Sequence, residues 1–249
     1  MTVTVDAPTL CFELSEDNKM VKDMVKKLAD EEIAPRAAHY DETREFPWEN
    51  TKKLAELGLM GITVPEEYGG AGMDTLAYVL VIEELSRACA ATGVIAAVQN
   101  SLATTPLLSF GSEDLKKKYL PQLASGDKIG AYALTEPGSG SDAASIQTTC
   151  REDGDHWVLN GQKTWITNST AAEIFIVYAT QDTAAGHKGI CCFVVEKSFE
   201  GFSLGKHEET MGVRASGTCP LTFDNVKVPK ENMVGKPGEG FKVAMATLD

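Results

Sequence analysis

The chain has 249 residues, with 43% hydrophobic and 24% charged side chains and a net charge of −13 at pH 7. That length can bury a sizeable core, and the negative charge argues against a nucleic-acid partner, which needs a basic patch to collect phosphates. No stretch approaches the roughly 20 apolar residues that span a bilayer, which leaves an acidic soluble enzyme without a membrane partner as the plain interpretation.

The first half of the chain, up to about residue 125, has apolar residues at helical spacing. The stripe within residues 21–33 predicts a helix that Ser15 caps and that ends near Pro35. Helices of the same kind, the last of them capped by Ser112, are predicted over residues 48–57, 91–103 and 113–124.

A further helix is expected to begin at its cap Asp74 and to run through Ala88. It is apolar nearly all round, and such helices are usually buried at the centre of a bundle. Glu83 and Glu84 lie on this helix without an evident reason for both to be there. Adjacent carboxylates on a helix point in different directions, so we do not expect them to form a general acid/base pair.

From Lys128 onward the apolar period changes to two, which predicts strands. Asp153-Gly154 and Asn160-Gly161 are the two clearest hairpin turns. Short strands with such turns predict a small antiparallel barrel or sandwich, so the expected fold class is α+β. The predicted strands are 129–134, 145–150, 156–159, 163–167, 173–180, 190–196, 202–207 and 221–228.

The last residues, 241–249, read as a helix of good helix formers without a glycine cap at its end. Its apolar face has no evident partner, so we expect a longer protein that has been cut at the start of a third region. The expected division is an all-α helical domain over residues 1–125, a middle β-domain over 126–235, and the start of a truncated C-terminal helical domain over 236–249.

Cysteine usage and the N-terminus bear on the compartment. Met1–Asp6 shows no basic segment leading into an apolar one, so we expect no secretory signal. The four histidines are unclustered and no metal site is expected. Scattered cysteines without a C-x-x-C pair indicate reduced, mostly buried thiols in a cytosol-like compartment. They are Cys11, Cys89, Cys150, Cys191, Cys192 and Cys219.

The stretch from Tyr132 to Ala143 concentrates glycine, serine and proline after a predicted strand. Gly138 and Gly140 can adopt positive φ and carry no Cβ, so several backbone N–H groups could meet at one point. Thr135, Ser139 and Ser141 add hydroxyls that can donate to phosphate or ring acceptors. By composition alone, an ordinary polar turn between two strands is the better interpretation of this stretch.

A second stretch, Lys163–Asn168, gives that loop a functional alternative. Trp165 offers a flat face with one N–H donor, and Thr167, two places on, points to the same side of a strand. The pair could stack on a planar heterocycle and hydrogen-bond its edge, although a core tryptophan beside a surface threonine is the simpler alternative. Together the two stretches favour a dinucleotide with a planar ring. No G-x-G-x-x-G opens a helix after a strand, which disfavours a Rossmann site.

Four motifs, in order along essentially the whole chain, resemble those of the acyl-CoA dehydrogenase family, in its short-chain, butyryl-CoA-like branch. They are Val64–Gly70 (VPEEYGG), Tyr132–Asp142 (YALTEPGSGSD), Lys163–Asn168 (KTWITN) and Phe223–Pro229 (FDNVKVP). The resemblance implies that FAD lies between the β-domain and a C-terminal four-helix domain, completed by a neighbouring subunit.

The resemblance also implies roles for individual residues. Thr135 would hydrogen-bond the flavin ring edge, and Ser141 would lie near the pyrophosphate and the CoA. Trp165 would cover the dimethylbenzene side, and Thr167 would hydrogen-bond flavin N5. Asp249 matches the start of an Asp-x-x-Arg stretch that contacts the CoA pantetheine. The full set implied for the cofactor is Tyr132, Ala133, Leu134, Thr135, Gly140, Ser141, Trp165, Ile166 and Thr167.

The implied reaction is α,β-dehydrogenation of a short-chain acyl-CoA to the trans-2-enoyl-CoA. A carboxylate removes the α-proton while the β-hydrogen leaves as hydride to the flavin, and the electrons pass to electron-transfer flavoprotein. In this branch the catalytic glutamate lies late in the C-terminal domain, so no catalytic residue is assigned here and the fragment is expected to be inactive. The resemblance further implies a homotetramer.

Three alternatives stay open at this point: an acyl-CoA oxidase-like enzyme, an electron-bifurcating relative, and a non-catalytic module that binds flavin or acyl-CoA. The compartment is equally open between a bacterial cytoplasm and a mitochondrial matrix after processing. The preferred acyl chain length does not follow from the sequence.

Overall fold

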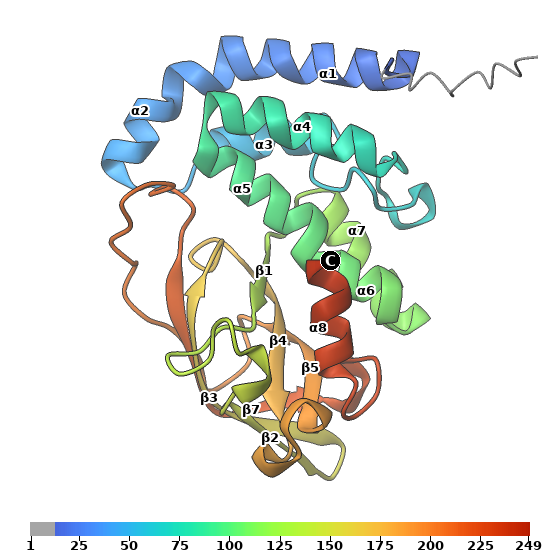
Figure 1. The fold of residues 1–249 in the computed structure, drawn as a ribbon, viewed down its shortest axis with the longest axis vertical. Coiled ribbons are helices and arrows are strands. Elements are labelled where there is room, and N and C mark those ends of the chain that lie inside the picture. Colours follow the sequence, from blue (N-terminus) through green and yellow to red (C-terminus); the bar gives the residue numbers. More distant parts are fainter. Residues whose placement is uncertain (1–12) are drawn as a thin grey trace, which may run out of the picture.

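Helices fill the first half of the chain and strands most of the second half in the computed structural model, which describes residues 13–249 (Figure 1). Helices α1 to α7 form one end of the molecule, the sheet forms the other, and α8 lies beside the sheet. The expectations about Met1–Asp6 and Cys11 concern residues outside the described range. The arrangement confirms a helical part followed by a β part.

The first helix begins as predicted but does not end at Pro35. Ser15 caps α1 (Glu16–Leu28) by accepting a hydrogen bond from a first-turn backbone N–H. The chain then continues through a π-helical turn, η1 (Ala29–Ile33), into α2 (Ala34–Thr43). Pro35 lies in the first turn of α2, directly after the π-helical turn, so the proline is accommodated without a break in the helical run.

The predicted helix that begins after Asp74 is present, but it is not buried on all sides. Leu76 and Val79 on α4 are 45% and 52% exposed, so the expectation of a helix at the centre of a bundle is wrong. Glu84 is buried and pairs with Arg87 at 2.9 Å, whereas Glu83 faces solvent. The remaining helices of this half are α3 (Trp48–Glu56), α4 (Thr75–Ala88), α5 (Ala90–Ala97), the π-helical η3 (Val98–Ala103), α6 (Thr105–Phe110) and α7 (Glu113–Ala124).

The eight strands form one mixed sheet, so the prediction of a purely antiparallel barrel or sandwich is wrong in strand direction. The order is β6-β7-β3-β2-β4-β5-β8, and β1 pairs with β4 in parallel. The β2–β3 hairpin lies between β1 and β4 along the chain, and strand periodicity does not encode which distant strand is the partner. The strands are β1 (Gly130–Ala133), β2 (Thr149–Asp153), β3 (His156–Ile166), β4 (Ile174–Thr180), β5 (Ile190–Glu196), β6 (Phe202–Leu204), β7 (Cys219–Pro229) and β8 (Met233–Val234).

Of the two predicted hairpins, one is confirmed and one is wrong. Gly154 turns the chain between β2 and β3 with a φ of 63°. Asn160-Gly161 lies within the continuous strand β3. Gly161 serves close packing there, since a Cβ at this position would lie 2.6 Å from the Thr148 backbone.

Strand β4 lies between two cores, which explains why each of its seven residues is buried. Phe175 and Val177 join the core shared with the N-terminal helices, whereas Ile176 and Tyr178 join a second core shared with α7 and α8. A strand covered on both faces reads as a continuous apolar run. The five cysteines in the described chain are all buried and free, in agreement with the expectation of reduced thiols.

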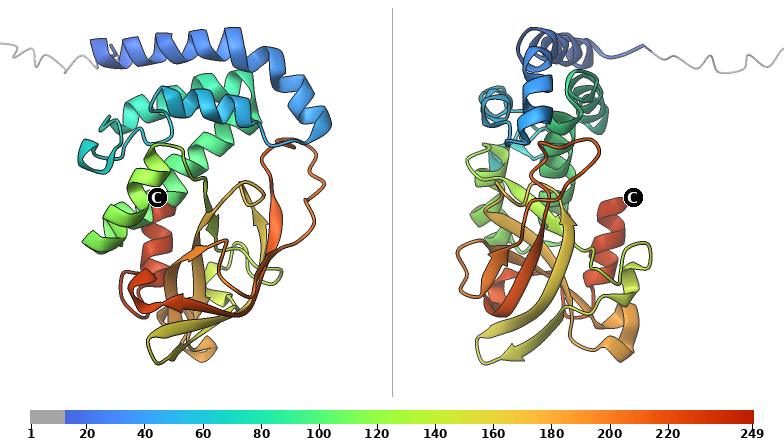
Figure 2. Two further views of the ribbon diagram at one scale, coloured as in Figure 1. Left: turned by 180° about the vertical axis from the view of Figure 1, so that it is seen from behind. Right: turned by 90° about the vertical axis from the view of Figure 1, so that its left-hand side faces the viewer.

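Helix α8 (Gly240–Leu248) packs against the sheet, so the expectation that its apolar face lacks a partner is wrong. Val243 and Ala244 are fully buried in the second core. A Cβ at Gly240 would lie 2.5 Å from the backbone of Cys191, which shows how closely the helix approaches β5. The side view in Figure 2 shows α8 on the same side of the sheet as the loop that follows β1.

Candidate functional site

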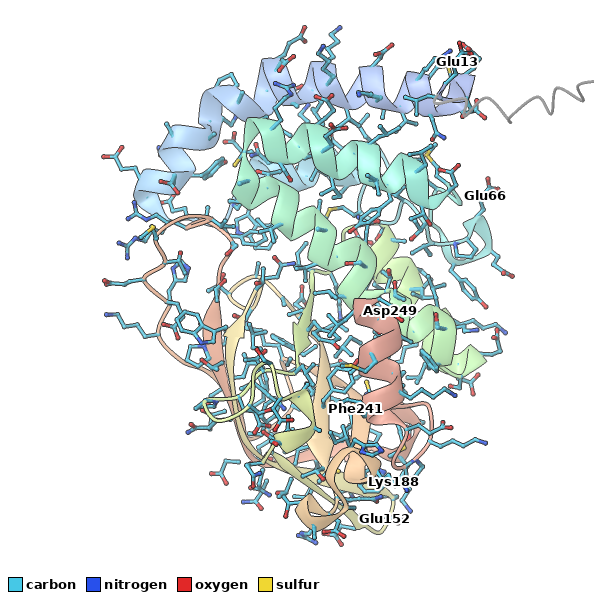
Figure 3. All side chains as sticks on the ribbon, in the orientation of Figure 1. Glu13, Glu66, Glu152, Lys188, Phe241 and Asp249 are labelled. Carbon is cyan, nitrogen blue, oxygen red and sulfur yellow. The ribbon has the colours of Figure 1, made fainter. Side chains whose placement is uncertain are left out.

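A cavity of about 560 Å³ lies between the loop after β1, the end of β3, η3 and α8. Its size is typical of a small-molecule site. Eight of the nine residues implied for the cofactor line it, namely Tyr132, Leu134, Thr135, Gly140, Ser141, Trp165, Ile166 and Thr167. Ala133 is fully buried and is not part of the wall. Asp249 lies at the far end of α8 from Phe241 and is likewise not part of the wall (Figure 3).

The loop after β1 is closed by its own hydrogen bonds. Glu136 and Ser139 exchange two backbone bonds of 2.8 and 3.1 Å, and the Ser139 hydroxyl donates to the Asp142 carbonyl. Ser139 is therefore occupied within the loop, whereas Thr135 and Ser141 face the cavity. The expected positive φ at Gly138 and Gly140 is not found, so these glycines contribute only the missing Cβ, next to open space.

Trp165 faces the cavity because strand β3 bulges immediately before it ends. Lys163 pairs with Leu221 and Ile166 with Cys219, so three steps along β3 match two along β7. Trp165 takes a φ of 59° within this bulge, and its side chain is 57% exposed. Bulges re-aim side chains beside functional sites, and a large residue with positive φ is a strained one. The indole ring thus forms a flat, open wall of the cavity.

We expect Trp165→Gly to leave the fold as stable as the parent or more stable by about 1 kcal/mol, since glycine relieves the backbone strain. Trp165→Ala is the matched control, because alanine removes the indole and keeps a Cβ at positive φ. Urea unfolding of both variants measures the difference. A glycine variant less stable than the alanine variant would show that the bulge carries no strain.

The opposite wall of the cavity is apolar. On α8, Phe241, Met245 and Leu248 follow one another at helical spacing and all line the cavity. Val98 and Leu102 line it from η3. Sequence reasoning missed the residues of α8, although their spacing of four and three positions was visible in the sequence. The cavity therefore offers hydroxyls and a flat ring on one side and aliphatic and aromatic carbon on the other.

Beneath the cavity lies a buried ion pair that sequence reasoning also missed. The Lys163 Nζ lies 2.7 Å from Glu136 Oε1 and also donates to the Leu134 carbonyl at 3.0 Å. Lys163 is fully buried, and burial lowers its pKa to about 8. Burial opposes ionisation of Glu136, but Lys163 and the Gln147 and Thr148 N–H groups together hold the pKa of that carboxyl below its usual range.

The depressed Lys163 pKa predicts a pH dependence of stability. From about pH 8 to the ordinary lysine pKa of about 10.4, the unfolded chain binds a proton that the folded chain has released. The contribution of this group to the free energy of unfolding therefore rises with pH across that window. Urea unfolding between pH 7.5 and 9.5 should show the parent gaining stability relative to Lys163→Met. If the free energy of unfolding of the parent fell relative to that of Lys163→Met over this pH range, the lowered pKa of Lys163 would be contradicted.

Two further observations concern membrane spans and metal ligands. None of the helices in the described part of the chain is both long and apolar enough to cross a membrane. Within residues 13–249, no three His, Cys, Asp or Glu side chains gather where they could hold a metal ion.

Comparison with known families matches the chain in two consecutive parts. Residues 15–127 match the family model described as acyl-CoA dehydrogenase, N-terminal domain, and residues 131–226 match the one described as acyl-CoA dehydrogenase, middle domain. The chain is 48% identical over 238 residues to the short-chain specific acyl-CoA dehydrogenase of Clostridium acetobutylicum, covering 96% of this chain. It spans 63% of the length of that curated relative.

Solved structures superpose closely on the chain. The butyryl-CoA dehydrogenase of Megasphaera elsdenii gives a TM-score of 0.93 at 38% identity, over 96% of this chain and 63% of that one. A second chain comes from work on the electron transferring flavoprotein of Acidaminococcus fermentans and flavin-based electron bifurcation. It gives a TM-score of 0.93 at 44% identity, over 96% of this chain and 63% of that one. The acyl-CoA dehydrogenase of Bacillus anthracis complexed with FAD gives a TM-score of 0.88 at 41% identity, over 95% of this chain and 40% of that one.

Proposed function

This chain belongs to the acyl-CoA dehydrogenase family, and we propose that it holds FAD in an enzyme that oxidises short-chain acyl-CoA thioesters to trans-2-enoyl-CoA. One observation carries the proposal: a single cavity brings together the loop after β1 and the bulged end of β3, two segments about 30 residues apart in the chain. The whole reaction is proposed for the protein that contains this chain, since the chain spans 63% of its curated relative.

The cavity fits a planar ring with polar groups at its edge. Trp165 presents its exposed ring to the cavity, and Tyr132 contributes part of the wall. A Cβ at Gly140 would have nothing within 4 Å, so the backbone there is open to a bulky ligand. Within the described chain, neither the Thr135 hydroxyl nor the Thr167 hydroxyl donates a hydrogen bond to another group. Both are therefore free to donate to the edge of a ring.

We assign these residues the following roles. Trp165 covers the dimethylbenzene side of the flavin, Thr135 bonds the ring edge, Thr167 donates to N5, and Ser141 lies near the pyrophosphate and the CoA. The bound cofactor supplies the hydride acceptor, and the protein orients it. A donor at N5 stabilises charge that develops there, and a preformed donor needs no reorganisation during the reaction. We assign no catalytic base within this chain.

The partners and the domain limits are part of the same proposal. Acyl-CoA is the substrate, with Val98 and Leu102 near its acyl end, and Asp249 contacts the pantetheine. Electron-transfer flavoprotein is the electron acceptor, and the protein is a homotetramer. The domains are residues 1–125, 126–235 and 236–249. Bacterial and mitochondrial enzymes are both among the relatives, and either a bacterial cytoplasm or a mitochondrial matrix fits.

The test is the visible spectrum of the purified whole protein that contains this chain, since no catalytic base is assigned within the chain itself. We expect a flavin absorbance band that anaerobic addition of butyryl-CoA bleaches, with palmitoyl-CoA as the chain-length control. A protein that takes up FAD but does not respond to butyryl-CoA would favour a non-catalytic binding module. A protein that neither contains nor takes up flavin would contradict the proposal.

A further inference from the structure

The two segments that build the cavity are joined beneath it by the buried ion pair Lys163–Glu136. The two side chains are 0% and 5% exposed, and their charged atoms lie 2.7 Å apart. Lys163 belongs to β3 and Glu136 to the loop after β1, so the pair connects residues 27 positions apart in the chain. No other ion pair of the described chain is buried on both sides to this degree.

Each partner also fixes backbone. Lys163 donates to the Leu134 carbonyl, and the next residue on β3, Thr164, donates its N–H to the Thr135 carbonyl at 2.9 Å. The Glu136 carboxylate accepts the N–H groups of Gln147 and Thr148, which lead into β2. Three separate segments therefore depend on one pair of charges for their relative position.

The bonded segments include the residues that face the cavity. Leu134 and Thr135 line the cavity on one side of the pair, and Trp165 lines it two residues beyond Lys163. Thr135 lies between the two residues of the loop that Lys163 contacts. A change in the distance between Lys163 and Glu136 would therefore alter the spacing between the Thr135 hydroxyl and the Trp165 ring.

Stability alone is a poor reason for such a pair. Two charges that are removed from water lose their hydration, and their mutual attraction offsets this cost only when the geometry is good. A well-packed apolar pair of similar volume often makes the protein equally stable or more stable. The pair here has the required geometry, since its charged groups make four hydrogen bonds, one to each other and three to backbone groups. Such directional bonds fix a relative position of backbone segments that apolar contacts would leave adjustable.

We propose that Lys163 and Glu136 are positioning residues that hold the two walls of the cavity at the spacing the flavin requires. The inference rests on the proposed function. Neither side chain touches the cavity, so both act through Thr135 and Trp165.

The titration of Lys163 gives the proposal a pH signature. The groups that face its ammonium are the Glu136 carboxylate and the Cys150 thiol. The contact with Cys191, together with burial, raises the pKa of the Cys150 thiol, and the same contact lowers the pKa of Cys191. Lys163 loses its charge near pH 8, and a Lys163→Met variant, which has no ammonium to titrate, distinguishes this effect from ionisation of Cys191. We expect FAD to bind more weakly as pH rises through about 8, where the ion pair is lost.

The experiment compares FAD affinity with stability in four variants of the protein. Lys163→Met and Glu136→Gln each remove one charge, and the double variant Lys163→Met/Glu136→Leu replaces the pair by apolar groups. Arg87→Met is the matched control, since it strips the partner from the buried Glu84 in the helical half. Quenching of flavin fluorescence gives the Kd for FAD, and urea unfolding gives the midpoint, at pH 7 and pH 9.

We expect both single variants to raise the Kd at least tenfold, and the double variant to recover the parent midpoint while its Kd stays raised. Arg87→Met should lower the midpoint without changing the Kd. A double variant that binds FAD within twofold of the parent would overturn the positioning role and leave the proposed function intact. Absence of FAD binding by the parent would overturn both.

Discussion

Replacing Lys163 by methionine is expected to lower the free energy of unfolding by about 3–5 kcal/mol, the cost typical of leaving one charge of a buried pair without its partner. Glu136 is 6% exposed, so water cannot replace the lost ammonium. The two backbone N–H groups that remain hydrogen-bonded to the carboxylate offset part of this loss. Urea unfolding followed by circular dichroism measures the change.

The control for this prediction is an ion pair of the same kind at the surface. Lys230 pairs with Glu152, with side chains that are 43% and 59% exposed. Exposed pairs contribute about 0–1 kcal/mol, so Lys230→Met should change stability by no more than that. If Lys163→Met cost as little as Lys230→Met, the buried charge of Glu136 would have to be relieved in some other way, and the account of the pair would be wrong.

Replacing Gly240 by valine is expected to separate α8 from the sheet. The first side-chain atom would lie 2.5 Å from the Cys191 carbonyl carbon, which is backbone and cannot rotate away. Overpacking of this kind costs about 1–3 kcal/mol. Because Phe241 and Met245 follow directly on the same helix and line the cavity, we also expect FAD to bind at least tenfold more weakly.

Gly212 provides the matched control for that substitution. A Cβ there would have nothing within 4 Å, and its φ is not positive. Gly212→Val should therefore leave stability within about 0.5 kcal/mol of the parent. If Gly240→Val were equally neutral and bound FAD like the parent, α8 would not form a wall of the cofactor site.

Features that depend on neighbouring residues could be predicted from the sequence. The caps Ser15, Asp74 and Ser112 each accept a backbone N–H three residues on, so the signal and its target lie within one turn. The strand limits of β5 were also predicted to the residue, since its continuous run of apolar, β-branched and aromatic residues can be read within the segment itself.

Features that depend on distant contacts could not be predicted from the sequence. The parallel pairing of β1 with β4 joins residues more than 40 positions apart. Asn160-Gly161 has the composition of a hairpin turn, yet the approach of Thr148 from the neighbouring segment decides that the glycine stays within a strand. Pattern alone does not show which segment a strand will meet.

Within the candidate site, too, features set by neighbouring residues could be predicted and features set by distant contacts could not. The motif loops identified the residues that line the polar side of the cavity, because each motif is continuous in sequence. The bulge that turns Trp165 outward follows from the register between β3 and β7, and the Lys163–Glu136 pair follows from the contact of β3 with the β1 loop. The apolar wall required knowing that α8 packs on β5.

The most direct test of the proposed site is a titration of the flavin-free protein with FAD, followed by tryptophan fluorescence in the parent and in Trp165→Phe. The described chain holds two other tryptophans, Trp48 and the buried Trp157, as internal references. We predict saturable binding of one FAD per chain, with most of the quenching lost in Trp165→Phe. Binding without a contribution from Trp165, or no saturable binding by the parent, would contradict the assignment of this cavity to the flavin.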